Sequence, residues 1–564
     1  MNLIGAGNAM TLGKLLLDKG LLDQGQLEGI QELQRSDGVR LDEAIVSRGL
    51  LSERQLLEVM AERLHLPLVE LEDLEIDDAA LKSLPSKIVF RKRLLPIARE
   101  NGTLKVATCD AFDLYALDDV RMTTGLEIQP VLALREEIDK HIKAHYGLGG
   151  DTLDELASDE EVEVAGASAG EDDLLEMAQE ASVIKLVNEI ILEAVNERAS
   201  DIHIEPYEET MSIRYRIDGV LQEASVPPQM HRFQAAIISR IKILANLNIA
   251  ERRIPQDGRI KFNVGGRQID VRVSVIPMLF GEGVVMRLLD KANILFKLQE
   301  IGMDAETYGV FRPLIERPHG IVLVTGPTGS GKTTTLYSSL NEIVGPELKV
   351  LTVEDPVEYH LGGVNQIPVN SQVGMTFAAG LRAILRHDPD VVMIGEIRDL
   401  ETAQAAIQAS LTGHLVLSTL HTNDAPSAAT RLMDMGIEPY LVSSTLAGSM
   451  AQRLVRRVCE HCKVAYLPDP AKTPADFGLK PGEEVWRGEG CDRCRKTGYR
   501  GRMGVYELMT MNDELAEMIV DRAPANRLEA KAREHGMRLL REDGWIKVRR
   551  GETTIDEVLT YTAV

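Results

Sequence analysis

The stretch Gly326-Pro-Thr-Gly-Ser-Gly-Lys332-Thr333 fits the pattern G-x-x-x-x-G-K-[ST] and directly follows an apolar run, Ile321–Thr325. The run has the length and β-branched content of a buried strand, and residues 333–340 are predicted to form the next helix. This arrangement directs backbone N–H groups and the positive end of the helix dipole at a phosphate. The sequence therefore predicts a P-loop in which Lys332 reaches the β- and γ-phosphates and Thr333 binds Mg²⁺. The residues predicted to bind the nucleotide are Gly326, Pro327, Thr328, Gly329, Ser330, Gly331, Lys332, Thr333 and Thr334.

Three later segments place polar residues at or just beyond the end of an apolar strand. They contain Glu354-Asp355-Pro-Val-Glu358, Gly395-Glu396 and the run from His414 to His421. In an open parallel sheet the carboxyl ends of the strands share one edge, and the P-loop lies on that edge. We therefore expect these acids and histidines to gather around the γ-phosphate and its metal ion.

Length and charge limit the possible classes of protein. A chain of 564 residues predicts roughly three or four domains. The net charge is −24, and residues 151–180 hold 12 acidic side chains without a lysine or arginine, which predicts an extended acidic linker. The chain has no basic tract, so we expect no nucleic acid partner. It also shows no secretory signal and no apolar run of about 20 residues, which predicts a cytoplasmic protein.

Four of the five cysteines form two Cys-x-x-Cys pairs, Cys459/Cys462 and Cys491/Cys494. Four thiolates in this spacing suit a tetrahedral Zn²⁺ site with no position left for water, so the site is expected to be structural. Redox pairing is the alternative reading of these cysteines. His461 is a possible substitute ligand, although a solvent-facing position is expected, and Cys109 is expected to be a small buried residue.

Upstream of the P-loop, the sequence predicts an α+β region. An amphipathic helix is predicted at 183–196, with apolar residues on one face. Strands follow in which arginines alternate with apolar residues. The arginines of interest are Arg214, Arg216 and Arg272, and for any single one a surface or structural ion pair is the ordinary reading.

Together these motifs resemble the type II/IV secretion ATPase superfamily. The resemblance extends to Ser200–Pro206, Arg253–Arg259 and the ending at 551–558. It implies a multidomain α/β fold: a RecA-like P-loop ATPase core with a parallel-rich sheet, preceded by a PAS-like α+β domain and a helical and α+β N-terminal region, with a zinc-binding subdomain inserted in the C-terminal domain. The expected domains are 1–65 (helical repeat), 66–148 (second lobe), 149–181 (linker), 182–300 (arginine-bearing) and 301–564 (ATPase, with the zinc subdomain at about 455–505).

The resemblance also implies a homohexamer that hydrolyses ATP with the help of Mg²⁺, while the Zn²⁺ expected at the four cysteines is structural. Glu358 is expected to activate the attacking water, with Glu354 and Asp355 as competing candidates. Glu396 would hold Mg²⁺ through water, and His421 would sense the γ-phosphate. The three arginines would neutralise transition-state charge when the domains close, and hydrolysis would thereby be coupled to rotation.

Within the superfamily, residues 408–413 and 446–455 look closer to the type II secretion ATPase than to the pilus extension ATPase, which is the alternative. The implied function is a motor that powers assembly of a pseudopilus and is recruited to the inner membrane by its N-terminal region.

That N-terminal region carries a repeat with an offset of 29 residues, visible in Leu12–Leu22 and Leu41–Leu51. It resembles the N-terminal domain of secretion and pilus assembly ATPases, some of which bind cyclic di-GMP through paired Arg-Leu-Gly motifs. Here Thr11 replaces the first arginine, and Asp42 follows Arg40-Leu41 where glycine is expected. A carboxylate facing a dianionic ligand is unfavourable, so docking to inner-membrane platform proteins is expected and cyclic di-GMP binding is disfavoured. A nucleic-acid motor and a cyclic di-GMP sensor are the weaker alternative functions.

Overall fold

The structure is a computed structural model that describes residues 16–17, 19–27, 29–30, 41–71, 74, 76–100, 102–110, 113–146, 181–224, 226, 228–264, 267–290 and 296–563. The chain divides into two compact units. The first unit contains the described residues up to 288, except 218–220 and 262–270. The second unit contains these two short segments and the described residues from 289 onward. The predicted acidic linker lies outside the described residues up to position 180. No helix in the part of the chain that the structure describes has both the length and the apolar character needed to cross a bilayer.

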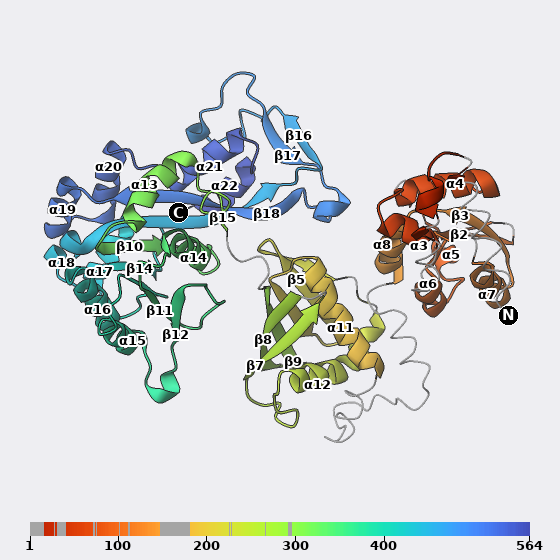
Figure 1. The fold of residues 1–564 in the computed structure, drawn as a ribbon, viewed down its shortest axis with the longest axis horizontal. Coiled ribbons are helices and arrows are strands. Elements are labelled where there is room, and N and C mark those ends of the chain that lie inside the picture. The colour runs from red at the N-terminus through yellow and green to blue at the C-terminus, as the bar shows by residue number, and fades with distance from the viewer. Residues whose placement is uncertain are drawn as a thin grey trace. The chain divides into compact units, whose positions relative to one another are not determined.

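The second unit is built on a seven-stranded sheet with the order β12-β11-β13-β14-β10-β15-β18 (Figure 1). The strands are β10 (Gly320–Thr325), β11 (Val350–Glu354), β12 (Val364–Pro368), β13 (Val391–Ile394), β14 (Leu415–Leu420), β15 (Leu446–Val458) and β18 (Tyr499–Thr510). The first six strands in this order pair in parallel, and β18 pairs antiparallel with β15. The predicted parallel-rich sheet is therefore confirmed, and the carboxyl ends of its parallel strands share one edge.

Helices pack on both faces of this sheet, so its central strands are buried on both sides. On β10, Ile321 and Leu323 belong to one apolar cluster, and Val322 and Val324 belong to another. This burial explains why β10 reads as an unbroken apolar run. The helices are α13 (Ala305–Ile315), α14 (Lys332–Ile343), α15 (Phe377–Ile384), α16 (Leu400–Leu411), α17 (Ser427–Asp434), α18 (Pro439–Thr445), α19 (Asp513–Val520), α20 (Ala525–Glu534), α21 (Leu540–Arg549) and α22 (Ile555–Thr562).

A small hairpin stands between β15 and β18 in the sequence. It consists of β16 (Lys463–Tyr466) and β17 (Val485–Gly488), which pair antiparallel. The two Cys-x-x-Cys pairs flank this hairpin, one before β16 and one after β17. Short 3-10 helices occur at η2 (Pro228–Phe233), η3 (Ser371–Val373), η4 (Ala475–Phe477) and η5 (Asp492–Cys494).

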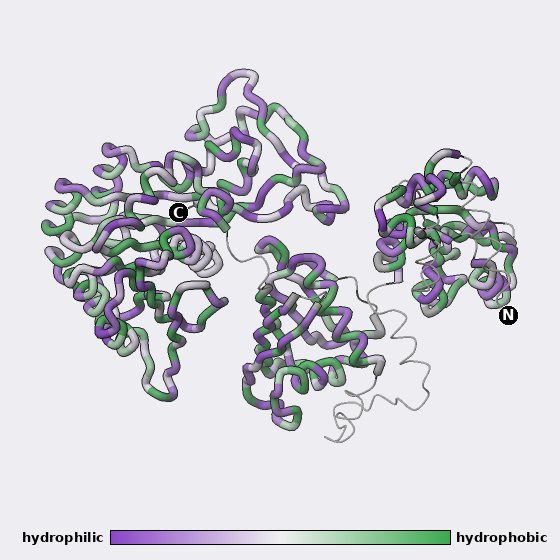
Figure 2. Tube along the Cα trace, in the orientation of Figure 1, coloured by the Kyte–Doolittle hydropathy of each residue, from purple (hydrophilic) through white to green (hydrophobic). Residues whose placement is uncertain are grey.

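A six-stranded sheet of order β6-β5-β4-β9-β8-β7 lies upstream of the ATPase sheet in the sequence. Its elements are α11 (Ala181–Asn196), β4 (Asp201–Pro206), β5 (Met211–Ile217), β6 (Val220–Glu223), α12 (Gln234–Leu244), β7 (Gln256–Val264), β8 (Arg267–Met278) and β9 (Gly281–Asp290). Buried and partly exposed residues alternate along β5, and hydrophobic and hydrophilic residues are interspersed along the tube of this region (Figure 2). The predicted apolar face of α11 is buried. These elements confirm the predicted helix and alternating strands.

The N-terminal region contains a three-stranded sheet of order β1-β2-β3. Its elements are α3 (Leu41–Ser47), α4 (Glu53–Leu64), α5 (Asp78–Leu81), α6 (Ser86–Lys92), β1 (Leu94–Glu100), β2 (Thr103–Thr108), α7 (Leu114–Thr124), β3 (Glu127–Leu132) and α8 (Arg135–Tyr146). Cys109 packs against the apolar core of this sheet and is partly buried, which agrees in part with the expected small buried residue.

The two copies of the repeat begin their second helices in the same way. Asp23 accepts a hydrogen bond from the backbone of Gln26 (2.7 Å), whose side chain accepts one from the Asp23 backbone (2.9 Å). Ser52 and Gln55 form the same reciprocal pair, at 3.3 and 3.0 Å. Both pairs are capping boxes that satisfy the first backbone N–H groups of the helix. The glycines that precede these capping boxes both have left-handed φ angles, Gly20 (67°) and Gly49 (66°).

Candidate active site at the carboxyl edge of the sheet

The P-loop joins the buried strand β10 to helix α14, as predicted. At Gly326 φ is 146°, and an added Cβ would meet the backbone oxygen of Gln452 at 2.6 Å. Only glycine fits this turn without moving backbone. Pro327, Thr328 and Gly329 are exposed at the tip of the loop, while Ser330 is buried. The exposed tip leaves the backbone of the loop accessible to a phosphate.

Lys332 begins α14 and lies over the P-loop. Its Nζ donates to the carbonyl oxygens of Gly326 (2.8 Å) and Pro327 (2.9 Å). Burial lowers the pKa of Lys332 to about 8; the negative charge of Glu396 opposes this shift, and the positive charge of Arg453 adds to it. The lysine is therefore held where a phosphate would bind, with a pKa close to physiological pH.

ATP binding should weaken above pH 8. Bound phosphates favour the charged lysine, so the pKa of Lys332 is higher in the complex than its value of about 8 here. Binding then takes up a proton, and the ATP dissociation constant should rise by up to about tenfold per pH unit above pH 8. Fluorescence titrations with a labelled ATP analogue at pH 7, 8 and 9 measure this, with thermal melts at each pH as the control for folding. A dissociation constant that stays level from pH 7 to 9 would contradict the assignment.

Glu354 ends β11 and is fully engaged by its neighbours. It is 3% exposed, and its Oε2 accepts a hydrogen bond from the Tyr337 hydroxyl. Its Oε1 accepts from the Thr352 hydroxyl (2.5 Å) and the Gln366 amide (3.0 Å). A carboxylate with both oxygens occupied by protein donors is well suited to holding the loop in place and poorly placed to take a proton from water.

Glu358 lies four residues farther along the same loop and is half-buried. Its backbone N–H donates to the Tyr337 hydroxyl at 3.4 Å. Tyr337 therefore links Glu354 to the backbone of Glu358, while Asp355 is exposed. Among the three candidate acids, Glu358 combines partial burial with a backbone position that this network fixes. Its role as the group that activates water remains a prediction.

Glu396 and His421 come together at the ends of β13 and β14. His421 Nε2 is 3.3 Å from Glu396 Oε2, and Arg398 forms an ion pair with Glu396 Oε1. The backbone around them is tied across the strands, since the Thr419 hydroxyl donates to Gly395 O at 2.8 Å. The structure thus brings together two residues that are 25 positions apart in sequence. Glu396 is also close enough to Lys332 to influence its pKa.

These residues provide suitable groups for Mg²⁺. Thr333 is exposed in the first turn of α14, so its hydroxyl can face a metal beside the phosphates. The carboxylate of Glu396, whose side chain is 14% exposed, supplies a hard oxygen for a metal-bound water. Oxygen donors of this kind suit Mg²⁺, so the residues present fit the metal that a P-loop requires.

Two residues beside the P-loop were missed by the sequence reasoning. Gln452, on the neighbouring strand β15, accepts a hydrogen bond from the Thr335 hydroxyl at 2.7 Å. Arg453 donates to the backbone oxygen of Asn423 at 3.0 Å, and burial lowers its pKa. In the sequence, the stretch 446–455 indicates only a branch of the superfamily. Nothing in the local sequence indicates that β15 pairs with β10.

The predicted arginines lie in the six-stranded sheet. Arg214 forms an ion pair with Glu205, and the Arg216 Nε is 3.9 Å from Asp201. Arg272 is half-buried on β8. At least two of these arginines therefore pair with acids of their own sheet, and a role toward a nucleotide remains a prediction.

The four paired cysteines form one cluster. Their sulfur atoms all lie within 4.8 Å of one another, with Sγ–Sγ distances of 3.9 Å for Cys459–Cys491 and 3.8 Å for Cys462–Cys494. Four sulfurs about 2.3 Å from a tetrahedral Zn²⁺ would lie about 3.8 Å apart, so the geometry fits zinc. His461 is exposed and faces Arg493 at 3.0 Å, which agrees with the expected solvent-facing position.

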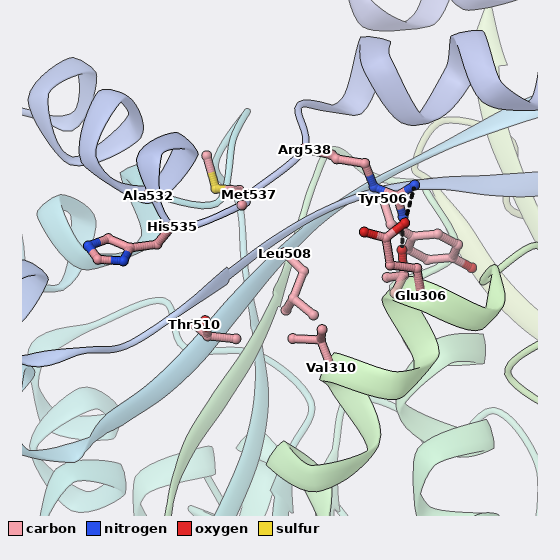
Figure 3. Close-up of a pocket in the computed structure, with 11 residues that line it drawn as sticks. Glu306, Val310, Tyr506, Leu508, Thr510, Ala532, His535, Met537 and Arg538 are labelled. Atoms are coloured by element: carbon pink, nitrogen blue, oxygen red, sulfur yellow. Dashed lines mark hydrogen bonds and ion pairs between the residues drawn. The ribbon is translucent and has the colours of Figure 1, made fainter.

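A separate groove of the second unit lies between α13, β18 and the segment joining α20 to α21 (Figure 3). Arg538 donates to the Thr307 hydroxyl at 2.6 Å and lies 3.4 Å from Glu306. Arg538 is thus paired with Thr307 and Glu306 of the groove. None of the residues predicted to bind or hydrolyse a nucleotide lines it, so the chemistry belongs to the P-loop edge.

A P-loop on a parallel sheet, with a carboxylate and a histidine at the same edge, defines a nucleoside triphosphatase. The chain belongs to the type II/IV secretion system protein family, which it matches over residues 176–560, and residues 64–152 match the MshEN domain. It is an ATPase of that family. The ATPase DotB of Yersinia pseudotuberculosis has the same fold over 67% of this chain and 93% of that protein, with 21% identity and a TM-score of 0.51.

Two relatives are similar to this chain over nearly its whole length. Type II secretion system protein E of Xanthomonas campestris is 46% identical over 561 residues, covering 97% of both chains. The type IV pilus assembly ATPase PilB of Myxococcus xanthus is 43% identical over 560 residues, covering 98% of this chain and 99% of that protein. Type II secretion system ATPase E of Vibrio cholerae is 53% identical over 393 residues, covering 69% and 77%.

Proposed function

We propose that this chain is the ATPase motor of a type II secretion machine and works as a homohexamer. The observation that carries this proposal is the gathering of Lys332, Glu396 and His421 at one edge of the sheet in a member of this family. Glu358 activates the attacking water, Glu396 holds Mg²⁺ through water, and His421 senses the γ-phosphate. Hydrolysis then drives assembly of the pseudopilus and protein export.

The arginine-bearing region supplies positive charge when the domains close during the cycle. Arg214, Arg216 and Arg272 are the candidates to neutralise charge in the transition state. Arg214 is paired with Glu205 and Arg216 with Asp201. In this role, each arginine would leave its carboxylate and bind the nucleotide instead. The domain boundaries given above, including the PAS-like region at 182–300, belong to the same proposal.

Secretion is favoured over pilus extension by the relatives. Over nearly the whole chain, the Xanthomonas campestris secretion protein is 46% identical, against 43% for the Myxococcus xanthus pilus ATPase. Deletion of the gene in its host should abolish release of secreted enzymes and leave surface pili intact. Loss of pili with normal secretion would instead assign the chain to pilus extension, the second candidate.

The N-terminal region is proposed to dock to inner-membrane platform proteins and so to place the motor at the membrane. The described residues do not include Thr11, Arg40 or the side chain of Asp42. Cyclic di-GMP is disfavoured because the sequence has Asp42 where glycine is expected. The net charge of −24 supports the expectation that nucleic acid is not a partner.

The cysteine cluster is proposed to hold a structural Zn²⁺. Replacing Cys459 and Cys491 by serine should release about one zinc per chain and lower the melting temperature of the hairpin region at 455–505. Metal analysis and differential scanning calorimetry measure the two effects. Cys109→Ser, which changes the cysteine outside the cluster, is the matched control and should keep its zinc. Full stability in the zinc-free double variant would refute the structural role.

A further inference from the structure

The loop that follows His421 is held from several sides. It runs through residues 422–425, between β14 and α17. Arg453 donates to the oxygen of Asn423, and the Ser449 hydroxyl donates to the oxygen of Ala425 at 2.7 Å. The last residue of β10, directly before the P-loop, also contacts this loop, since the hydroxyl of Thr325 is 3.5 Å from the oxygen of Asp424. The loop therefore lies between the P-loop strand, β15 and the C-terminal elements.

Glu507 connects this loop to the C-terminal helices. It lies on β18 and is 3% exposed. Its Oε1 accepts the backbone N–H of Ala425 at 2.8 Å, and its Oε2 accepts the backbone N–H of Leu540 at 3.2 Å. Leu540 is the first residue of α21, where backbone N–H groups have no partner within the helix. One buried side chain thus joins the loop after the histidine to the start of α21.

The charge of Glu507 is unfavourable in this place, which argues for a role beyond filling space. Burial raises its pKa to about 7, the two backbone N–H groups oppose this shift, and Asp424 and Glu529 add negative charge nearby. A neutral glutamine of the same shape would avoid the buried charge. Glutamine, however, offers one acceptor oxygen, so its NH₂ group would face an N–H donor. Carboxylate is the side chain that accepts from both backbone groups.

We propose that Glu507 is a positioning residue for ATP hydrolysis, which fixes the loop after His421 and couples its position to α21. A shift of His421 when the γ-phosphate leaves would move Ala425, and Glu507 would carry that movement to the C-terminal helices. This inference depends on the proposed catalytic edge but concerns a residue that touches neither nucleotide nor metal. It predicts an effect on turnover and little effect on ATP binding.

The test compares three variants of the full chain: Glu507→Gln, Ser449→Ala and Glu557→Gln. Glu557 is the control for burial, because it is also 3% exposed and also accepts a backbone N–H from the sheet, that of Arg456 at 2.8 Å. It differs from Glu507 in forming an ion pair with the Arg456 guanidinium. Steady-state phosphate release gives kcat and KM, binding of a labelled ATP analogue gives Kd, and thermal melts report folding.

Glu507→Gln should lower kcat by about tenfold, which corresponds to about 1.4 kcal/mol in the activation free energy. KM and Kd should stay within about twofold of the values for the unmodified chain. Ser449→Ala removes the hydroxyl that donates to the Ala425 oxygen and should also lower kcat. Glu557→Gln should leave kcat within about twofold of the value for the unmodified chain. An equal loss of kcat in Glu507→Gln and Glu557→Gln, or a change in KM alone, would overturn the proposal. If Glu507→Gln does not fold, Ser449→Ala decides, and a normal kcat in that variant overturns the proposal.

His421→Ala, measured alongside, separates this inference from the proposed role of His421. If His421→Ala turns over ATP normally while Glu507→Gln is slow, the sensing role of His421 fails and the positioning role of Glu507 stands. If His421→Ala is slow and Glu507→Gln is normal, the proposed function stands and this inference fails.

Discussion

Lys332→Ala should reduce ATP turnover by about 100-fold or more and weaken ATP binding. The lysine lies over the P-loop, with its Nζ 2.8 Å from the oxygen of Gly326, in the position where phosphate oxygens would replace the loop carbonyls. Loss of one well-placed donor to a reacting anion is worth about 3 to 4 kcal/mol, or about 10² to 10³ in rate. Steady-state phosphate release and binding of a labelled ATP analogue measure the two effects.

Lys472→Ala is the control for this variant, because it removes a lysine that is exposed in the second unit, between β16 and β17. Its turnover should stay within about twofold of the unmodified chain. If Lys332→Ala hydrolyses ATP as fast as Lys472→Ala, the P-loop has no part in the reaction.

Glu358→Gln should bind ATP normally and hydrolyse it about 10² to 10³ times more slowly. Glutamine keeps the size of the side chain but cannot accept the proton of the attacking water, a step that commonly contributes 10² to 10⁴ in rate. The backbone of Glu358 is tied to Tyr337, so the loop should keep its position. Single-turnover hydrolysis and analogue binding, measured on the same preparation, separate chemistry from affinity.

Glu354→Gln distinguishes the two acids of this loop. Glu354 accepts hydrogen bonds at both oxygens inside the protein, so its amide variant would leave a buried donor facing another donor. We expect a lower melting temperature in Glu354→Gln and an unchanged one in Glu358→Gln. Fast hydrolysis by Glu358→Gln, together with slow hydrolysis by a fully stable Glu354→Gln, would move the catalytic role to Glu354.

Local patterns predicted much of this fold. The apolar run before Gly326 forms strand β10, as predicted. The glycine pattern forms a turn in which a side chain at Gly326 would meet the backbone oxygen of Gln452. The cysteine spacing became a cluster of four sulfurs. The strand and the turn depend on residues close in sequence or on a periodicity that burial enforces, so the sequence carries their signal directly. The two cysteine pairs are distant in sequence, and their joining was predicted from the ligand spacing that Zn²⁺ requires.

Long-range pairing could not be predicted in the same way. Arg453 and Gln452 reach the P-loop because β15 pairs with β10 across more than 100 positions, and Glu507 reaches Ala425 because β18 pairs with β15. No turn or repeat in the sequence signals these pairings. The position of Glu354 illustrates the same limit, since only the structure reveals the hydroxyl of Tyr337 and the amide of Gln366 that occupy its oxygens.

Whether the active sites are completed between subunits can be measured as the ATPase rate per chain at increasing protein concentration. The measurement is made with and without the cytoplasmic domain of a type II secretion inner-membrane protein. A motor whose active sites are completed between subunits should show a rate per chain that rises with concentration and rises again with the partner. A rate per chain that is independent of concentration and unaffected by the partner would contradict an oligomeric secretion motor.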